Sequence, residues 1–108
     1  MSYKDEYHPK VKKDLKRLDR VTVEFFFDHH LDNILQNPYG NEKLHGNLEG
    51  VYSYHFTKER VDYRVGYFIN EDKKIIYIVM VGKRENFYEI LRRRIKYKKL
   101  GRLRERAG

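Results

Sequence analysis

Four side chains with the chemistry to bind and cleave a phosphodiester stand in the second half of the chain: His55, Arg64, Arg84 and Tyr88. His55 and Arg64 occur in segments whose apolar residues alternate, so each is expected on the polar face of a β-strand. Arg84 and Tyr88 follow directly after a third segment of this kind. Adjacent strands of an antiparallel meander would bring all four side chains onto one open face of a sheet.

This combination of side chains suits RNA both as a ligand and as a substrate. Arginine guanidinium groups bind phosphate oxygens through paired hydrogen bonds, and aromatic rings stack on unpaired bases. Cleavage through the 2′-hydroxyl needs a group that removes its proton, cations that stabilise the phosphorane and a group that protonates the leaving 5′ oxygen. Histidine is the natural proton carrier near neutral pH. These steps require no metal ion or other cofactor, so none is expected.

Each of these residues also has an ordinary structural explanation. His55 could be a half-exposed polar residue of a strand, and Arg64 could simply pair with a carboxylate. Tyr88 could pack on a helix surface, and the pattern alone does not decide for Arg84. A substrate role is favoured for Arg64, because an arginine in mid-strand beside Gly66 is unusual. The glycine is expected to leave space above the sheet into which the arginine can project.

The composition predicts one folded domain that binds a polyanion or an acidic partner. Of the 108 residues, 37% are charged and 15% are aromatic, and the formal net charge is +8. Disordered chains are usually poor in aromatic residues, and a surface this basic favours polyanions. Lys58, Arg60 and Lys83 lie close in sequence to the predicted site and are expected to extend its positive surface for RNA.

Several classes of protein and site are excluded or disfavoured. The absence of cysteine excludes disulfides, thiolate catalysis and cysteine-based zinc sites. No apolar run approaches the roughly 20 residues of a membrane span, and the N-terminal segment lacks the apolar core of a signal peptide. A cytoplasmic protein without membrane contact is therefore expected. His29 and His30 have no histidine four residues on and no nearby set of ligating carboxylates, which favours a structural role.

The periodicity along the chain predicts an α+β domain of order β-α-α-β-β-β-α. A compact antiparallel sheet of about four strands is expected, with two N-terminal helices on one face and a basic C-terminal helix. The third long strand is nearly apolar on both faces, so it should be central or covered by helices. Asp19 or Thr22 could cap the second helix, which ends at Asn37-Pro38. The expected elements are a weak strand at 3–7, helices at 9–18 and up to 37, strands at 51–57, 63–70 and 75–82, and a helix from 85.

The C-terminal segment carries an unusual run of positive charge. Residues 92–106 contain nine basic side chains against the single acid Glu105. Such a run is most often a solvated helix face, but its density also fits binding to RNA, for which Arg92 and Arg93 are the first candidates. The basic residues are Arg92, Arg93, Arg94, Lys96, Lys98, Lys99, Arg102, Arg104 and Arg106.

Five sequence pieces, in order and at familiar spacing, resemble the RelE/ParE toxin superfamily from about Tyr3 to Leu91. The most specific combination is the L-x-G loop, the YR-x-x-Y strand and the V-G-x-R-x-x-x-Y end. The pieces are KDLKRL (Lys13–Leu18), Asn37-Pro38, LHGNLEGVYSYHF (Leu44–Phe56), YRVGY (Tyr63–Tyr67) and IIYIVMVGKRENFY (Ile75–Tyr88). The resemblance implies a single toxin domain spanning residues 1–108, with a basic C-terminal extension at about 92–108.

The resemblance also implies a function. RelE-type members are toxins of type II toxin–antitoxin pairs that enter the ribosomal A site and cleave mRNA without a metal, and they are held inactive by a cognate antitoxin. Arg64 matches the arginine that contacts the scissile phosphate, Arg84 the arginine that stabilises the transition state, and Tyr88 the tyrosine that orients the substrate. His55 stands where RelE-like members carry lysines for proton transfer, which leaves the general base open. ParE-like inhibition of DNA gyrase, or RNA binding without catalysis, are the alternatives.

The basic extension is longer than a minimal member of this superfamily needs. Its charge suggests binding to ribosomal RNA or to an acidic segment of the antitoxin. A chain truncated after Arg94 that kept full toxicity and full affinity for the antitoxin would exclude both roles.

Overall fold

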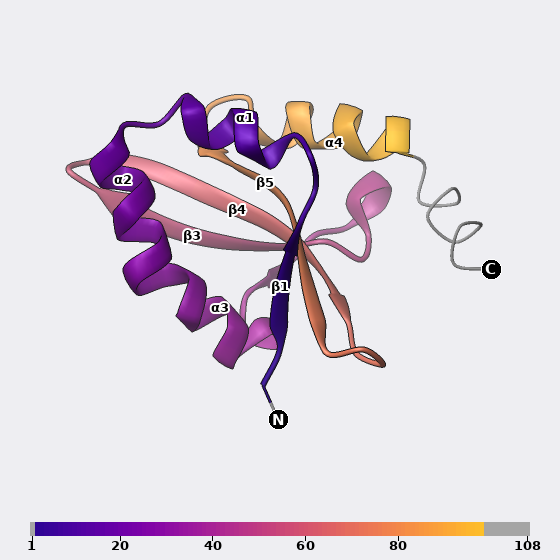
Figure 1. Ribbon diagram of the computed structural model, residues 1–108. Coiled ribbons are helices and arrows are strands. Elements are labelled where there is room, and N and C mark those ends of the chain that lie inside the picture. The colour runs from indigo at the N-terminus through magenta and orange to yellow at the C-terminus, as the bar shows by residue number, and fades with distance from the viewer. Residues whose placement is uncertain (1, 99–108) are drawn as a thin grey trace.

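The computed structural model describes residues 2–98, and the side chains of residues 2–95, as a five-stranded sheet with helices on both faces (Figure 1). The strands lie in the order β1-β5-β4-β3-β2. Their bounds are Lys4–Tyr7 for β1, Glu42–Lys43 for β2, Tyr52–Lys58 for β3, Val61–Asn70 for β4 and Ile75–Lys83 for β5. The predicted α+β class and the meander of three long strands are confirmed.

The sheet departs from the expected one at its two edges. β1 pairs with β5 in parallel, with Lys4 opposite Ile75 and Tyr7 opposite Ile78, so the sheet is mixed rather than wholly antiparallel. β2 adds a fifth strand of only two residues, which pair with Tyr52 and Ser53 of β3. Alternation shows that a segment is extended but does not give the direction of an edge strand. Two residues are also too few to show alternation at all.

The N-terminal helices cover one face of the sheet (Figure 1). They are α1 (Val11–Lys16), α2 (Arg20–Phe25), the π-helical segment η1 (Phe26–His30) and α3 (Leu31–Gln36). The side chain of Asp19 accepts a hydrogen bond from the Thr22 amide at 2.9 Å, which identifies Asp19 as the cap of α2. Two short 3-10 turns, η2 (Pro38–Gly40) and η3 (Gly46–Leu48), then lead towards β3.

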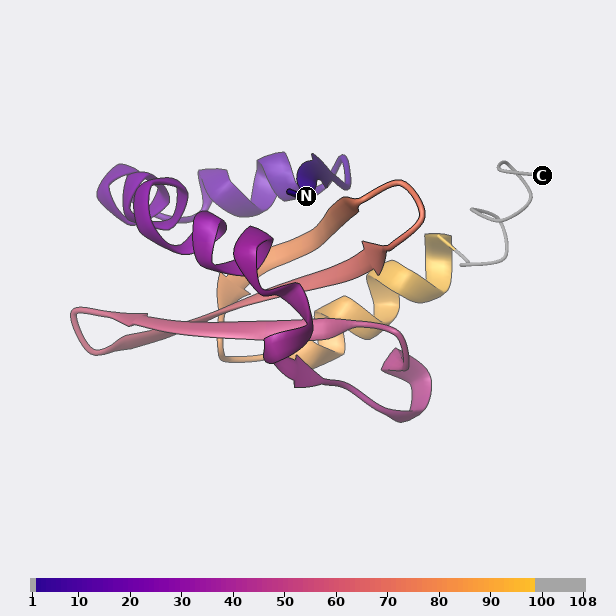
Figure 2. The same ribbon diagram turned by 90° about the horizontal axis from the view of Figure 1, so that it is seen from below.

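The last helix, α4 (Phe87–Lys98), covers the opposite face, so the sheet separates two apolar clusters (Figure 2). Phe26 and Ile34 of the N-terminal helices are fully buried against Val65, Tyr67 and other residues of one face. On the second face Phe87, Leu91 and Ile95 pack with residues that include Val51, Val79 and Met80. β5 therefore lies inside the sheet with a helix on each side, as its apolar sequence predicted.

A cluster of four residues, Tyr3, Tyr39, Glu71 and Lys74, ties the start of the chain to the β4–β5 turn. Both tyrosine hydroxyls donate to Glu71 Oε1, Tyr3 at 2.7 Å and Tyr39 at 2.8 Å, and Lys74 forms an ion pair with the same carboxylate. The Lys74 ammonium and the two hydroxyls lower the pKa of Glu71 to about 2. The folded state therefore favours the ionised carboxylate.

This cluster should make the stability of the fold depend on pH in the acid range. Because the pKa of Glu71 falls from 4.5 to about 2 on folding, its contribution is complete above pH 4.5 and is lost as the pH falls towards about 2. Urea midpoints measured across this range should therefore decrease more steeply for the wild type than for Glu71→Gln. Asp72→Asn, a change at the exposed neighbouring residue, should leave the wild-type slope unchanged. Equal slopes for all three proteins would contradict the prediction.

Candidate nucleic-acid interface and active site

The structure places the predicted polar residues on one face of the meander. In the sheet register His55 of β3 lies opposite Arg64 of β4, and Arg64 lies opposite Gly82 of β5. Arg64 alternates with Tyr63 and Val65, which belong to the cluster under the N-terminal helices, so it projects to the other face. This polar face is shared with α4, which covers the part of it nearer Gly66.

Arg64 has an unsatisfied donor at the centre of this face. Its Nε atom is buried and has no hydrogen-bond partner among the described residues. Within that part of the chain Arg64 also forms no ion pair, so the carboxylate partner that would have explained it structurally is absent. A buried donor without a partner costs stability, and an anion that accepts from the guanidinium would remove that cost.

His55 lies beside Arg64, and nearby groups of opposite charge shift its pKa in opposite directions. Its Nε2 atom is 3.0 Å from Glu42 Oε1, although 42% of the histidine side chain is exposed. Partial burial and the positive charge of Arg64 lower the pKa of His55, and they outweigh Glu42 and Asp62, which raise it. The imidazole is therefore neutral near pH 7, as a proton acceptor must be.

Arg84 is tied to the end of the same face by Asp62. Its backbone amide donates to the Asp62 carbonyl at 2.9 Å, and its Nη1 donates to the Asp62 carboxylate at 3.4 Å. Thr57 Oγ1 donates to the other carboxylate oxygen at 2.8 Å. The Thr57 hydroxyl, supported by Arg84, lowers the pKa of Asp62. Because the guanidinium is 64% exposed and the contact is long, this pair is weak and Arg84 can turn towards another anion.

Tyr88 borders the face from the first turn of α4. Its hydroxyl lies 3.4 Å from Ser53 Oγ, and Ser53 precedes His55 by two residues on the same face of β3. The ring also makes an edge contact with Phe87 at 5.2 Å between centroids. Tyr88 therefore packs on the protein and also presents its hydroxyl beside the strand that carries His55.

The additional basic residues predicted to bind RNA do not all lie together. Lys58 is only 13% exposed, and it shares a face with Phe56 under the N-terminal helices. Lys83 pairs with Tyr63 and lies on the same side of the sheet as Lys58. The hydrogen bonds from Thr22 lower the pKa of Asp19, and the positive charges of both lysines lower it further. The structure thus does not bring Lys58 to the polar face. Arg60 and Lys83 line a hollow of about 340 Å³ together with Arg84, at the end of the sheet.

Gly66 does not leave space for Arg64, contrary to the expectation from the sequence. A Cβ atom at Gly66 would lie 3.4 Å from Leu91 Cδ2 and 3.6 Å from Phe87 Cζ. The glycine therefore allows α4 to approach the sheet closely. The neighbours of Arg64 are instead set by strand pairing, which places His55 on one side of it and Gly82 on the other.

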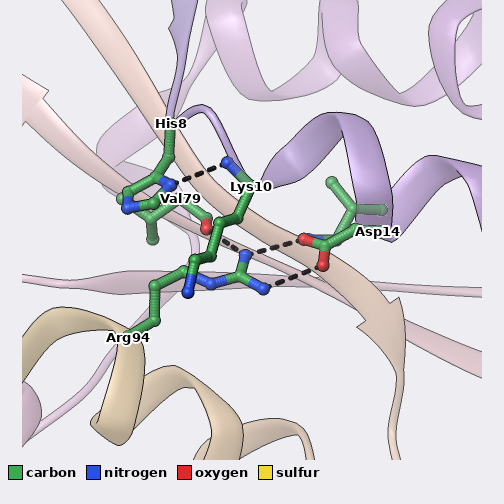
Figure 3. A network of polar contacts seen from close by, with 6 residues as sticks. His8, Lys10, Asp14, Val79 and Arg94 are labelled. Carbon is green, nitrogen blue, oxygen red and sulfur yellow. Dashed lines mark hydrogen bonds and ion pairs between the residues drawn. The ribbon is translucent and has the colours of Figure 1, made fainter. Parts of the chain in front are cut away.

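The basic C-terminal run divides into surface and interior residues. Arg92 and Arg93 are exposed on α4, whereas Arg94 points inward to Asp14 of α1 (Figure 3). Arg94 Nη1 and Nη2 donate to the two Asp14 oxygens at 2.8 and 2.9 Å, and Nη1 also donates to the Val79 carbonyl at 2.7 Å. Asp14 in turn accepts from the Val81 amide at 3.0 Å. Arg94 is thus an internal residue rather than part of a binding tail.

The rest of the basic extension cannot be placed on this surface. Residues 99–108 lie outside the described residues, as do the side chains of Lys96 and Lys98.

Three further residues of the polar face, Glu42, Ser53 and Asp62, were not predicted from the sequence. Glu42 lay in a segment that reads as loop, and Asp62 in a short polar turn. Within the described part of the chain no three metal-binding side chains come together.

The class of protein follows from this fold and from comparison with solved structures. The chain is similar to the toxin–antitoxin complex RelBE2 of Mycobacterium tuberculosis (TM-score 0.68, 19% identity, 78% of this chain and 100% of that one). It is also similar to a doubly substituted E. coli RelE toxin in the free state (TM-score 0.65, 24% identity, 82% and 90%). A third similar structure is the archaeal RelE–RelB complex of Pyrococcus horikoshii (TM-score 0.51, 26% identity, 79% and 98%). The fold is therefore that of RelE toxins.

The family follows from the sequence itself. Residues 6–92 match the model of the ParE-like toxin of type II bacterial toxin-antitoxin system, and the chain belongs to this family. The predicted resemblance to the RelE/ParE toxin superfamily is thereby confirmed. None of the curated proteins compared with the chain matches it. Among the described residues, no helix combines the length and the apolar character needed to cross a membrane.

Proposed function

We propose that this type II toxin is a ribosome-dependent endoribonuclease that enters the A site, cleaves mRNA there and so inhibits translation in the cytoplasm. The observation that carries the proposal is the buried, unpartnered Nε of Arg64 beside the neutral imidazole of His55. A cation without a partner fits a phosphate, and a neutral histidine next to it fits the removal of a proton from a neighbouring hydroxyl.

In the proposed reaction His55 takes the proton of the 2′-hydroxyl. The 2′ oxygen attacks the adjacent phosphorus, the bond to the 5′ oxygen breaks, and a 2′,3′-cyclic phosphate and a 5′-hydroxyl result. Arg64 neutralises the non-bridging oxygens, and Arg84 leaves Asp62 to stabilise the added negative charge. Tyr88 orients the substrate, and its hydroxyl is a candidate donor for the leaving oxygen. The reaction is balanced by one proton removed and one proton supplied.

The surrounding basic residues would hold the substrate and the ribosome. Arg60 and Lys83 line the hollow beside Arg84, and Arg92 and Arg93 are exposed on α4, so these four can contact RNA phosphates. Lys83 reaches this hollow from the side of the N-terminal helices, whereas Lys58, on the same side, does not line it. The similar RelBE2 and RelE–RelB structures are complexes with antitoxins, which supports a cognate antitoxin as the partner that covers this surface.

Primer extension on a defined mRNA tests the proposal. With programmed ribosomes the wild type should cut within the A-site codon, and without ribosomes it should not. Arg64→Ala and Arg84→Ala should both lose the cuts. Arg20→Ala should keep them, because Arg20 is 85% exposed on α2 and pairs there with Glu24. If the wild type leaves the mRNA intact under both conditions, the nuclease proposal is wrong.

The description of the matching family favours one second candidate, because that model is named for ParE-like toxins. We infer from it that inhibition of DNA gyrase is the alternative activity. A supercoiling assay with purified gyrase separates the two. Inhibition by the wild type and by Arg64→Ala alike, without mRNA cleavage, would establish the alternative.

A further inference from the structure

The residue that faces His55 most directly is Glu42, which lies in the shortest strand of the sheet. We infer that Glu42 is a positioning residue: its carboxylate accepts the Nε2 hydrogen of His55 and leaves the lone pair of Nδ1 free to act as the base. This inference rests on the proposed function, since it identifies which atom of His55 would take the substrate proton.

The contact itself determines the position of the imidazole hydrogen. Glu42 Oε1 and His55 Nε2 are 3.0 Å apart, which is hydrogen-bond distance. An ionised carboxylate can only accept, so Nε2 must carry the hydrogen. In a neutral imidazole the other ring nitrogen then holds the lone pair. When Nδ1 takes a proton, Glu42 is already placed to stabilise the imidazolium, as an aspartate does for the histidine of a hydrolase triad.

The fold holds Glu42 in this place through contacts on both sides. Before it, the buried Tyr67 hydroxyl donates to the Pro38 carbonyl at 2.6 Å and accepts from Asn41 Nδ2 at 2.9 Å. After it, the Leu44 amide donates to the Val51 carbonyl at 2.9 Å, and the Leu44 side chain is buried. These contacts explain why a strand of two residues persists at this edge.

The register of β2 completes the placement. Glu42 pairs with Ser53, so it shares a face with Ser53 and therefore with His55. The charged groups that act on His55 are Arg64 and Asp62 from β4 and Glu42 from β2. Of these three, Glu42 alone makes a hydrogen bond to the ring. The alternative is a surface ion pair without consequence, since both side chains are about half exposed.

Nitrogen-detected NMR of the histidine ring distinguishes these possibilities without any need for cleavage. In the wild type His55 should carry its hydrogen on Nε2 above its pKa. Glu42→Gln should lower the pKa of His55 further, because the carboxylate that favours the imidazolium is gone. Glu49→Gln, at an exposed residue of the neighbouring loop, should leave both quantities unchanged. A hydrogen on Nδ1, or identical titrations in all three proteins, would overturn the inference.

The cleavage assay then tests the mechanistic part. Glu42→Gln should lower the single-turnover rate by about 10- to 100-fold and move the acid limb of the pH–rate profile to lower pH, whereas Glu49→Gln should do neither. Full activity with an unmoved profile in Glu42→Gln would refute the positioning role. If the wild type cleaves no RNA, the proposed function fails, and the ring titration alone decides whether Glu42 holds His55.

Discussion

Replacement of Arg94 with alanine is expected to lower the free energy of unfolding by about 3–5 kcal/mol. The side chains of Arg94 and Asp14 are only 9% and 8% exposed, and they form two parallel hydrogen bonds. Without the guanidinium, the Asp14 carboxylate would stay buried, with the Val81 amide as its remaining donor within residues 2–95. Urea unfolding followed by circular dichroism measures the difference.

Two comparisons make this prediction specific. Arg93→Ala removes the exposed neighbour on α4 and should change stability by no more than about 0.5 kcal/mol. The double variant Asp14→Ala, Arg94→Ala should cost less than the sum of the two single variants, since neither charge is then left alone in the interior. An Arg94→Ala protein as stable as Arg93→Ala would show that the buried pair does not hold α4.

Arg64→Ala should lower the single-turnover cleavage rate by about 10²–10³-fold without a matching loss of stability. The rate should fall because the cation proposed to face the phosphate is removed. Stability should be retained because the Nε atom has no partner to lose among the described residues. Rates on ribosome-bound mRNA and thermal midpoints of the same samples test both parts.

Arg20→Ala is the matched control for this second prediction, because it removes an exposed arginine from the opposite face. It should leave both the rate and the midpoint close to those of the wild type. Arg64→Lys keeps the charge but not the paired hydrogen bonds, so its rate should fall between those of the wild type and Arg64→Ala. A midpoint that falls as far as that of Arg94→Ala would show that Arg64 serves the fold instead.

The long elements could be predicted from the sequence because their own residues carry the signal. Alternation in β3 and β4 showed that His55 and Arg64 share the face away from Tyr63 and Val65, and strand pairing confirms that they are neighbours. The parallel direction of β1 depends instead on where α1–α3 return the chain. The side of the sheet on which α4 packs depends on Gly66, whose role appears only with Leu91 beside it.

The parts of the site that escaped prediction are those made by partners distant in sequence. The role of Glu42 depends on its contact with His55. The role of Arg94 depends on its pairing with Asp14, which lies 80 residues away in the sequence. Charge density placed Arg94 with Arg92 and Arg93, and helical periodicity does not tell which of three adjacent arginines turns inward. Lys58 was expected near the polar face, but the alternation of β3 puts it with Phe56 on the other side.

The position of β5 inside the sheet has a consequence for the order of synthesis. Among the described strands β1 leaves the ribosome before the other four, yet β5, the strand that pairs with it, is made last of the five, and the Asp14–Arg94 pair closes later still. The nascent chain therefore emerges with its N-terminal helices but without the strand that joins β1 to β4. His55, Arg64 and Tyr88 can assemble only after β5 and the first turn of α4 have emerged. Under the proposed function, a toxin built in this way would have no complete site with which to act on the ribosome while its first strands are being made.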